Sequence, residues 1–323
     1  MISPSPTAPE AVRVVVLDPV DRGALERLSA AHDVQLAYGT PQEDVADRVR
    51  DARIIIVRSG VKLTAEVIEA APGLRGIVRA GAGTDNIDLG AARRAGVTVC
   101  NVPGGSANAV AELALGLCLA AARNIALADR QIRRDEWRKH ALAGVELAGK
   151  NLGVVGFGHI GSRIAGIGKA LGMSVLVSVG RPDEERRAGL AADGYRMAGL
   201  PELLGTADFL CLAVPLNDRT RHLIGPDELR AMRPGAFLVN VSRGGVVDEE
   251  ALYTALSEGV ISGAGVDVHA AEGVRSPLAG LDNVVLTPHI GAMSADAQRR
   301  IGERVTDAVE AMLSGAPVMN RMC

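Results

Sequence analysis

The stretch Val154-Val155-Gly156-Phe157-Gly158-His159-Ile160-Gly161 decides the fold of this chain. An apolar run leads into the pattern G-x-G-x-x-G, and apolar residues at helical spacing follow it. The first glycine permits a tight strand-to-helix turn, the second lets an anion approach bare backbone, and the third lets helix and strand pack closely. Unpaired N–H groups at the positive end of the helix then bind the anion. We therefore predict a dinucleotide-binding turn, with a plain glycine-rich turn as the alternative in a chain of 38 glycines.

The composition indicates a globular protein with aliphatic cores. At 323 residues the chain is long for one hydrophobic core, and 48% of its residues are hydrophobic but only 2% are aromatic. A net charge of -3 gives no electrostatic reason to expect nucleic acid or an anionic membrane as a partner. The four cysteines show no C-x-x-C pairing and no cluster has metal-site spacing, so we expect buried thiols and no metal. Without a secretory signal or a long apolar run, the expected location is cytoplasmic.

Short apolar runs alternate with helical patterns on both sides of the glycine turn. Before it, the expected strands are 12–17, 34–37, 53–57, 76–79 and 97–100. After it, the expected strands are 174–179, 209–215, 237–242, 263–268 and 284–287, which with the strand before Gly156 makes six. Such Val/Ile runs separated by helices are typical of parallel sheets covered on both faces. The fold class that we predict is α/β, with two Rossmann-like or flavodoxin-like domains, doubly wound parallel sheets, and an active site in the cleft between the domains.

The predicted domain boundary lies just before a long Ala/Leu-rich stretch. We expect residues 1–104, rejoined by 293–323, to form a substrate-binding domain, and residues 105–292 to form the dinucleotide-binding domain. The stretch 107–134 has few helix breakers and is predicted as one long helix. It would either cross between domains, pack against a second subunit, or be a plain core helix.

Three segments late in the chain each follow an apolar strand with charged or ionisable residues. They contain Arg243 (within 240–245), Glu272 (within 267–272) and His289 (within 287–291). In an open α/β sheet, ligands bind at the carboxyl ends of the strands. A guanidinium to hold a carboxylate, an imidazole to move a proton and a carboxylate to orient the imidazole suit hydride transfer to a 2-oxo acid. The alternatives are a solvated strand-end charge, a core histidine and a surface carboxylate, respectively.

The ordered motifs resemble those of the D-isomer-specific 2-hydroxyacid dehydrogenases over nearly the whole chain. The matching segments are RAGAGTDNID (79–88), NVPGGS (101–106), AEL (111–113), GFGHIG (156–161), NVSRGGVVD (240–248) and TPHIGA (287–292). The resemblance implies an NAD(P)-dependent oxidoreductase and a homodimer, with Arg243 binding the substrate carboxylate, His289 as acid/base and Glu272 as its carboxylate partner. In the family a proline usually follows this glutamate, whereas here Gly273 does.

The resemblance also implies the remaining contacts. The implied cofactor-binding residues are Gly156, Gly158, His159, Ile160, Gly161, Gly180, Arg181, Val214, Pro215, Val241, Asp267 and Gly291, with Asp267 near the nicotinamide amide. The implied substrate-binding residues are Arg58, Ser59, Arg79, Ala80, Gly81, Ala82, Gly83, Asn101 and Lys139.

The end of the second cofactor-domain strand bears on the choice between NAD and NADP. Val179 stands where a carboxylate would bind the ribose 2′-hydroxyl, and Gly180 and Arg181 follow it. The missing carboxylate and the guanidinium favour NADP. NAD is the alternative if Arg181 points to solvent.

Arg58 and Arg79 end two apolar strands and bear on the substrate. Two further cations are more than a monocarboxylate needs. Within the family, the resemblance is strongest to members that oxidise 3-phosphoglycerate. We therefore expect a small dianionic 2-hydroxy or 2-oxo acid, namely 3-phosphoglycerate, 3-phosphohydroxypyruvate or a phosphonate analogue. The alternatives are an NADPH-dependent glyoxylate/hydroxypyruvate reductase and, from another class, an NAD(H)-sensing binding protein resembling the C-terminal-binding-protein corepressors.

Overall fold

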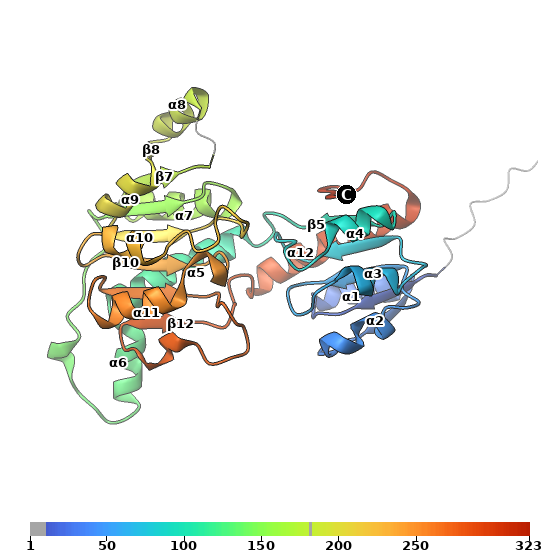
Figure 1. Cartoon of the computed structure of the whole chain (residues 1–323), viewed down its shortest axis with the longest axis horizontal. Helices are drawn as coiled ribbons and strands as arrows, with labels where there is room; N and C mark the ends of the chain where they lie inside the picture. Colours follow the sequence, from blue (N-terminus) through green and yellow to red (C-terminus); the bar gives the residue numbers. More distant parts are fainter. Residues whose placement is uncertain (1–10, 181–182) are drawn as a thin grey trace, which may run out of the picture. The chain divides into compact units, whose positions relative to one another are not determined.

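The computed structural model describes residues 11–180 and 183–323, and the described chain divides into two units (Figure 1). The first unit comprises the described residues up to Ser106 together with Ser294–Cys323, and the second comprises the described part of Ala107–Met293. Each unit contains its own parallel sheet, so each is described by itself below.

Five short strands form the sheet of the first unit. They are β1 (Arg13–Val16), β2 (Asp33–Leu36), β3 (Ile54–Val57), β4 (Gly76–Arg79) and β5 (Thr98–Asn101). All pairs are parallel and the order is β2-β1-β3-β4-β5, which is the flavodoxin-like order. Every residue of β3 and β4 is buried, as the continuous Ile/Val runs predict for strands covered on both faces.

Short helices cover this first sheet. They are α1 (Arg22–Ser29), η1 (Gln42–Asp44), α2 (Val45–Arg48), α3 (Ala65–Glu69), α4 (Leu89–Arg94) and the longer α12 (Ala295–Ser314). Helix α12 packs against α1 and β4. Helix α12 also holds the segment that follows β5, because Arg304 Nη1 donates to the carbonyl oxygen of Pro103 at 2.7 Å.

The sheet of the second unit has seven strands among the described residues. They are β6 (Asn151–Val155), β7 (Ser174–Ser178), β8 (Arg196–Met197), β9 (Phe209–Leu212), β10 (Phe237–Asn240), β11 (Gly263–Val266) and β12 (Val284–Leu286). The order β12-β11-β10-β9-β6-β7-β8 is that of a dinucleotide-binding sheet with one strand added beyond β11. The prediction of six strands was therefore wrong, because the two-residue edge strand β8 offers no apolar run to detect.

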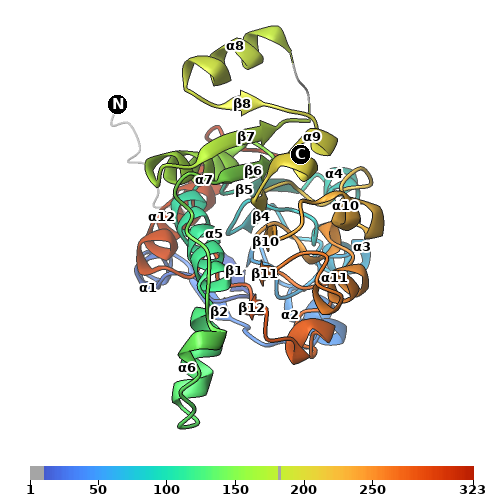
Figure 2. The same ribbon diagram turned by 90° about the vertical axis from the view of Figure 1, so that its left-hand side faces the viewer.

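The helices of the second unit lie around this sheet and beyond it (Figure 2). They are α5 (Ala107–Ala122), α6 (Ile125–Ile132), η2 (Lys139–Ala141), α7 (His159–Ala170), α8 (Glu184–Ala192), α9 (Leu200–Thr206), α10 (Pro226–Ala231), η3 (Gly244–Val246), α11 (Glu249–Ser257) and η4 (Pro277–Gly280).

The stretch 107–134 is two helices, which corrects the prediction of one. Asn124 has a φ of 54°, and the axes of α5 and α6 differ by 63° there. Helix α5 is a core helix that packs on α7, β10 and β11, whereas α6 contains no buried residue and projects from the unit (Figure 2). No single helix in the described ranges is long and apolar enough to cross a membrane, and only α5 and α6 taken together pass that test, by length and composition.

Candidate active site

The glycine-rich turn joins β6 to α7 with the geometry that an anion needs. Gly156 has a φ of 94°, and a side chain there would stand 2.5 Å from the carbonyl oxygen of Ala213. A side chain at Gly161 would overlap the carbonyl oxygen of Gly156, whereas no atom of the described residues lies within 4 Å of one at Gly158. Among the described residues no side chain caps the N-terminus of α7, so its first N–H groups lack a side-chain acceptor there. These residues, with His159 and Ile160 in the first turn, fit a dinucleotide pyrophosphate.

The end of β7 offers no carboxylate for a ribose 2′-hydroxyl among its described residues. Val179 is half-buried and Gly180 is exposed, while Arg181 lies outside the described residues. The next carboxylate, Asp183, is engaged as the N-cap of α8, where its Oδ1 accepts from the Arg186 N–H at 2.7 Å.

Arg186 is a residue of this region that sequence reasoning missed. Its Nη2 donates to the carbonyl oxygen of Phe157 in the glycine-rich turn at 3.2 Å. The pattern of α8 could not reveal this contact, because the neighbouring Arg187 stands in the same exposed run and instead pairs with Glu184 at 3.7 Å.

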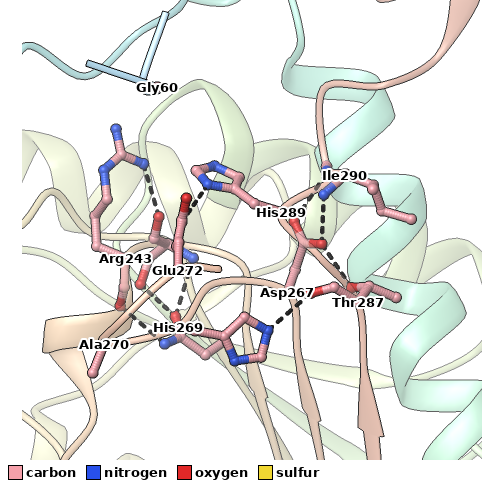
Figure 3. Close-up of polar contacts among 12 residues, drawn as sticks. Gly60, Arg243, Asp267, His269, Ala270, Glu272, Thr287, His289 and Ile290 are labelled. Atoms are coloured by element: carbon pink, nitrogen blue, oxygen red, sulfur yellow. Dashed lines mark hydrogen bonds and ion pairs between the residues drawn. The ribbon is translucent and has the colours of Figure 1, made fainter. Parts of the chain in front are cut away.

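Three ionisable side chains stand at the carboxyl ends of neighbouring strands (Figure 3). Arg243 follows β10, Glu272 lies in the loop after β11, and His289 follows β12. The Nδ1 atom of His289 lies 2.6 Å from Oε1 of Glu272. The His289 side chain is 28% exposed and that of Glu272 is 48% exposed, so both can be reached by a ligand. Gly273 has a φ of 79°, which explains why glycine rather than proline follows the glutamate here.

A pocket of about 460 Å³ opens beside this pair. Its lining includes Glu272, His289, Arg275 and His269. The His269 Nε2 atom lies 3.0 Å from the carbonyl oxygen of Thr287, so this second histidine anchors the backbone before His289. Among the described residues, no group of three or more His, Cys, Asp or Glu is arranged to hold a metal ion.

The other residues expected around a cofactor also follow strand ends of the second unit. Val214 and Pro215 come after β9, where Val214 is half-buried and Pro215 is exposed. Val241 comes directly after β10 and is buried, as is Gly291, two residues beyond His289. Asp267 directly follows β11 and is 1% exposed.

The substrate residues expected in the first unit include two arginines at strand ends. Burial lowers the pKa of Arg58, and the charge of Asp18 opposes that shift. The Arg58 Nη1 atom also lies 3.2 Å from Oε1 of Gln298 on α12. Arg79 is 8% exposed, and a side chain at Gly81 would overlap its Nη1 atom, so the guanidinium lies directly over the Gly81 backbone.

Some backbone groups of the loop after β4 are already hydrogen-bonded within the protein. The N–H of Gly81 donates to the carbonyl oxygen of Arg79 at 2.8 Å, whereas no backbone hydrogen bond from the N–H groups of Ala82 and Gly83 is found among the described residues. Asn101 Nδ2 donates to the Ala82 carbonyl oxygen at 2.6 Å and steadies the loop. The remaining expected residues are a buried Ala80, an exposed Ser59, and Lys139 on the exposed helix η2 of the second unit.

Comparison with known proteins gives consistent matches. A sequence model described as "D-isomer specific 2-hydroxyacid dehydrogenase, NAD binding domain" matches residues 115–291. D-3-phosphoglycerate dehydrogenase of Methanocaldococcus jannaschii is 41% identical over 305 residues, covering 94% of this chain and 58% of the relative. Hydroxypyruvate reductase of Thermotoga maritima is 40% identical over 303 residues, covering 92% of this chain and 97% of the relative.

A solved structure shows the same architecture. It is the NADPH-dependent glyoxylate/hydroxypyruvate reductase of Sinorhizobium meliloti in complex with NADP and malonate, with a TM-score of 0.86 and 30% sequence identity over 97% of each chain. The chain therefore matches this reductase over nearly its whole length, but spans only about three-fifths of the Methanocaldococcus phosphoglycerate dehydrogenase, of which it covers 58%.

Proposed function

The chain belongs to the D-isomer-specific 2-hydroxyacid dehydrogenases, a family of NAD(P)-dependent oxidoreductases, and we propose that it interconverts a small D-2-hydroxy acid and its 2-oxo acid. The observation that carries this proposal is the 2.6 Å contact between His289 and Glu272, beside the strand end that bears Arg243. When bound, the nicotinamide accepts or donates a hydride at its C4 atom.

Each of these three side chains has one task in the proposed reaction. Because Glu272 holds Nδ1 of His289, Nε2 is the ring atom that exchanges a proton with the hydroxyl oxygen of the acid. The Glu272 carboxylate stabilises the imidazolium that forms when the ring takes that proton. The Arg243 guanidinium binds the substrate carboxylate through paired hydrogen bonds.

A turnover assay with a panel of 2-oxo acids tests this function. We expect reduction of at least one acid, and its loss in His289→Gln and Arg243→Ala. A matched control is His32→Gln, a half-buried histidine of the first unit. Cofactor binding without turnover of any acid would instead support the cofactor-sensing binding protein.

We propose a dianionic substrate, 3-phosphohydroxypyruvate in the reductive direction or a phosphonate analogue. Arg58 and Arg79 support this because each is a strand-end guanidinium in the same unit, and Arg243 already suffices for one carboxylate. Lys139 is proposed to contribute to the same anionic group. The N–H groups of Ala82 and Gly83 are proposed to bind the carboxylate.

Two arginines that flank β3 allow a matched test. Arg58 follows the strand, whereas Arg53 precedes it and donates to the carbonyl oxygen of Gly73 at 2.8 Å. Arg58→Ala should lower kcat/KM for 3-phosphohydroxypyruvate by about 10² while changing that for glyoxylate little, as expected when one charge-assisted contact is lost. Arg53→Ala should not discriminate between the acids. Equal activity on both acids, untouched by Arg58→Ala, would contradict the dianionic substrate.

That contrary result would favour the second candidate, a glyoxylate/hydroxypyruvate reductase. The observation in its favour is similarity, since the Thermotoga hydroxypyruvate reductase is 40% identical over 303 residues, close to the 41% of the Methanocaldococcus phosphoglycerate dehydrogenase. The same acid panel separates the two candidates, because a reductase of this kind needs no contact with a second anionic group.

We propose NADP as the preferred cofactor. The described end of β7 carries no carboxylate that would repel a 2′-phosphate, and Arg186 approaches the glycine-rich turn from α8. The ratio of kcat/KM for NADPH and NADH should fall in Arg181→Ala and in Arg186→Ala. Arg187→Ala is the matched control, because Arg187 pairs with Glu184. An unchanged ratio in both test variants would remove the argument for NADP.

We propose a homodimer that forms through α6 and the segment after it. This region exposes large apolar side chains, with Ile125 and Ile132 53% exposed and Trp137 80% exposed. Such side chains on a projecting helix favour burial against a second copy. Light scattering should show a dimer in the wild type and a shift toward monomer in Ile132→Glu. A monomeric wild type would contradict this proposal.

A further inference from the structure

The turn that carries His289 closes around the buried residue Asp267 (Figure 3). The Asp267 carbonyl oxygen accepts from the N–H of His289 at 2.7 Å. Its Oδ1 accepts from the N–H of Ile290 at 2.8 Å, and its Oδ2 accepts from the N–H of Gly291 at 2.9 Å. Three successive N–H groups of the turn therefore end on oxygens of a single residue.

The same carboxylate also holds the start of the turn. The Thr287 hydroxyl donates to Oδ1 of Asp267 at 2.6 Å. The N–H of Thr287 donates to the carbonyl oxygen of Val266, the residue before the aspartate, at 3.0 Å. Because both the start and the end of the turn contact Asp267, its shape depends on this side chain.

The turn needs such support because of the backbone of His289. Its φ is 54°, in the left-handed region that residues with a side chain seldom adopt. Backbone of this kind persists only when its surroundings determine it. The contacts to Asp267 are those surroundings, and the conformation that they hold is the one in which His289 meets Glu272 at 2.6 Å.

We propose that Asp267 is a positioning residue for His289. By accepting hydrogen bonds from the 287–291 turn, it orients the His289 side chain toward Glu272. This inference rests on the proposed function. The resemblance to the family implies a different role, a contact with the nicotinamide amide. In the structure, Asp267 is 1% exposed and both carboxylate oxygens already accept hydrogen bonds from the turn.

A cofactor analogue distinguishes the two roles. In the 3-acetylpyridine dinucleotide, a methyl group replaces the amide NH2, so a contact between that NH2 and Asp267 is already absent. Asp267→Asn keeps the shape of the side chain but replaces one acceptor by a donor. We expect kcat to fall by about 10² with the natural cofactor and with the analogue alike, as a displaced catalytic group predicts. The KM for each cofactor should stay within about twofold. A loss of kcat or a rise in cofactor KM seen only with the natural cofactor would overturn the proposal.

A milder variant covers the case in which Asp267→Asn does not fold. Thr287→Val removes only the hydroxyl contact to Oδ1 and should lower kcat by about tenfold, the effect of one lost hydrogen bond, without changing the cofactor KM. Thr254→Val is the matched control, because that hydroxyl donates to the Glu250 carbonyl oxygen on α11 at 3.1 Å. Wild-type kcat in Thr287→Val would overturn the proposal.

Crystal structures of the wild type and of the folded variants give a readout that needs no turnover. We expect the separation of His289 Nδ1 and Glu272 Oε1 to lengthen beyond hydrogen-bonding distance in the variants. An unchanged turn and contact would overturn the positioning role even in an active enzyme. A wild type that reduces no 2-oxo acid would contradict the proposed function, while this geometric test would still decide the role of Asp267.

Discussion

The side chain of Asn240 turns back along the chain and holds the backbone of Arg243 by a hydrogen bond. Its Nδ2 donates to the Arg243 carbonyl oxygen at 3.0 Å. Its Oδ1 accepts from the N–H of Ser242 at 3.1 Å and from the Ser242 hydroxyl at 2.6 Å. Asn240 ends β10 and is 1% exposed, so this small network sets the direction in which Arg243 leaves the sheet.

Loss of this network should affect both stability and substrate binding. Asn240→Ala leaves buried polar groups without partners and should lower the free energy of unfolding by about 1–3 kcal/mol, measured by urea denaturation. The KM for the 2-oxo acid should rise because Arg243 is no longer held. Asn240→Asp keeps the acceptor for Ser242 but not the donor to Arg243, so it separates the two contacts. An unchanged KM in both variants would show that Arg243 is positioned by other groups.

Substitution of His289 should lower kcat more than substitution of its partner Glu272. His289→Gln removes the proton-transferring group and should lower kcat by about 10² to 10⁴. Glu272→Gln keeps an oxygen near Nδ1 but loses the charge, so about a tenfold fall is expected. Steady-state kinetics measures both. Glu250→Gln, at an exposed glutamate in the first turn of α11, is the control. Wild-type kcat in Glu272→Gln would mean that the 2.6 Å contact has no catalytic role.

Two glycines of the phosphate turn should separate folding from cofactor binding. In the described part of the chain nothing lies within 4 Å of a side chain at Gly158, so Gly158→Ala should fold with an unchanged Tm but bind the cofactor more weakly, by about tenfold or more. At Gly161 a side chain would overlap the Gly156 carbonyl oxygen, so Gly161→Ala should lower the Tm itself. Calorimetry and cofactor titration test both expectations. Equal Tm values for the two variants would contradict this division of roles.

Gly81 should matter because the guanidinium of Arg79 lies over it. The far end of a flexible side chain can move aside, so Gly81→Ala should displace the guanidinium, and because Gly81 has a φ of 158° the variant should also be less stable than the wild type. We expect it to reduce activity on a phosphorylated acid to about the level of Arg79→Ala. Because both changes remove the same interaction, the double variant should be no worse than either single one, in a kinetic double-mutant cycle. Additive losses would show that Gly81 acts independently of Arg79.

Much of the fold could be predicted because burial on both faces leaves a plain pattern. The Ile54–Val57 and Gly76–Arg79 strands are continuous runs of residues that fill parallel sheets. Two features of the fold were not predicted from the sequence, each for a physical reason. The edge strand Arg196–Met197 has no apolar run, and the break at Asn124 depends on a left-handed backbone within an Ala/Leu-rich stretch that otherwise suits one helix.

The candidate site divides in the same way. Ligands bind at the carboxyl ends of parallel strands, and this rule predicted Arg243, Glu272 and His289 as site residues from their positions in the chain. The contacts of Asp267 with the 287–291 turn and of Arg186 with Phe157 were not predicted. Both depend on where one side chain turns after its element ends, and neither periodicity nor spacing encodes that direction.

The buried thiol of Cys100 should make stability depend on alkaline pH. Burial raises the pKa of the Cys100 thiol to about 12 from the ordinary value of 9.0. Between these values the thiol of the unfolded chain ionises while that of the folded chain stays protonated, so the folded state is favoured less as the pH rises above about 9. At pH 10 the loss should be about 1 kcal/mol relative to pH 8. The difference in free energy of unfolding between wild type and Cys100→Ala, measured at both pH values, isolates this contribution. A difference that stays constant from pH 8 to pH 10 would show that the Cys100 thiol ionises as easily in the folded chain as in the unfolded one.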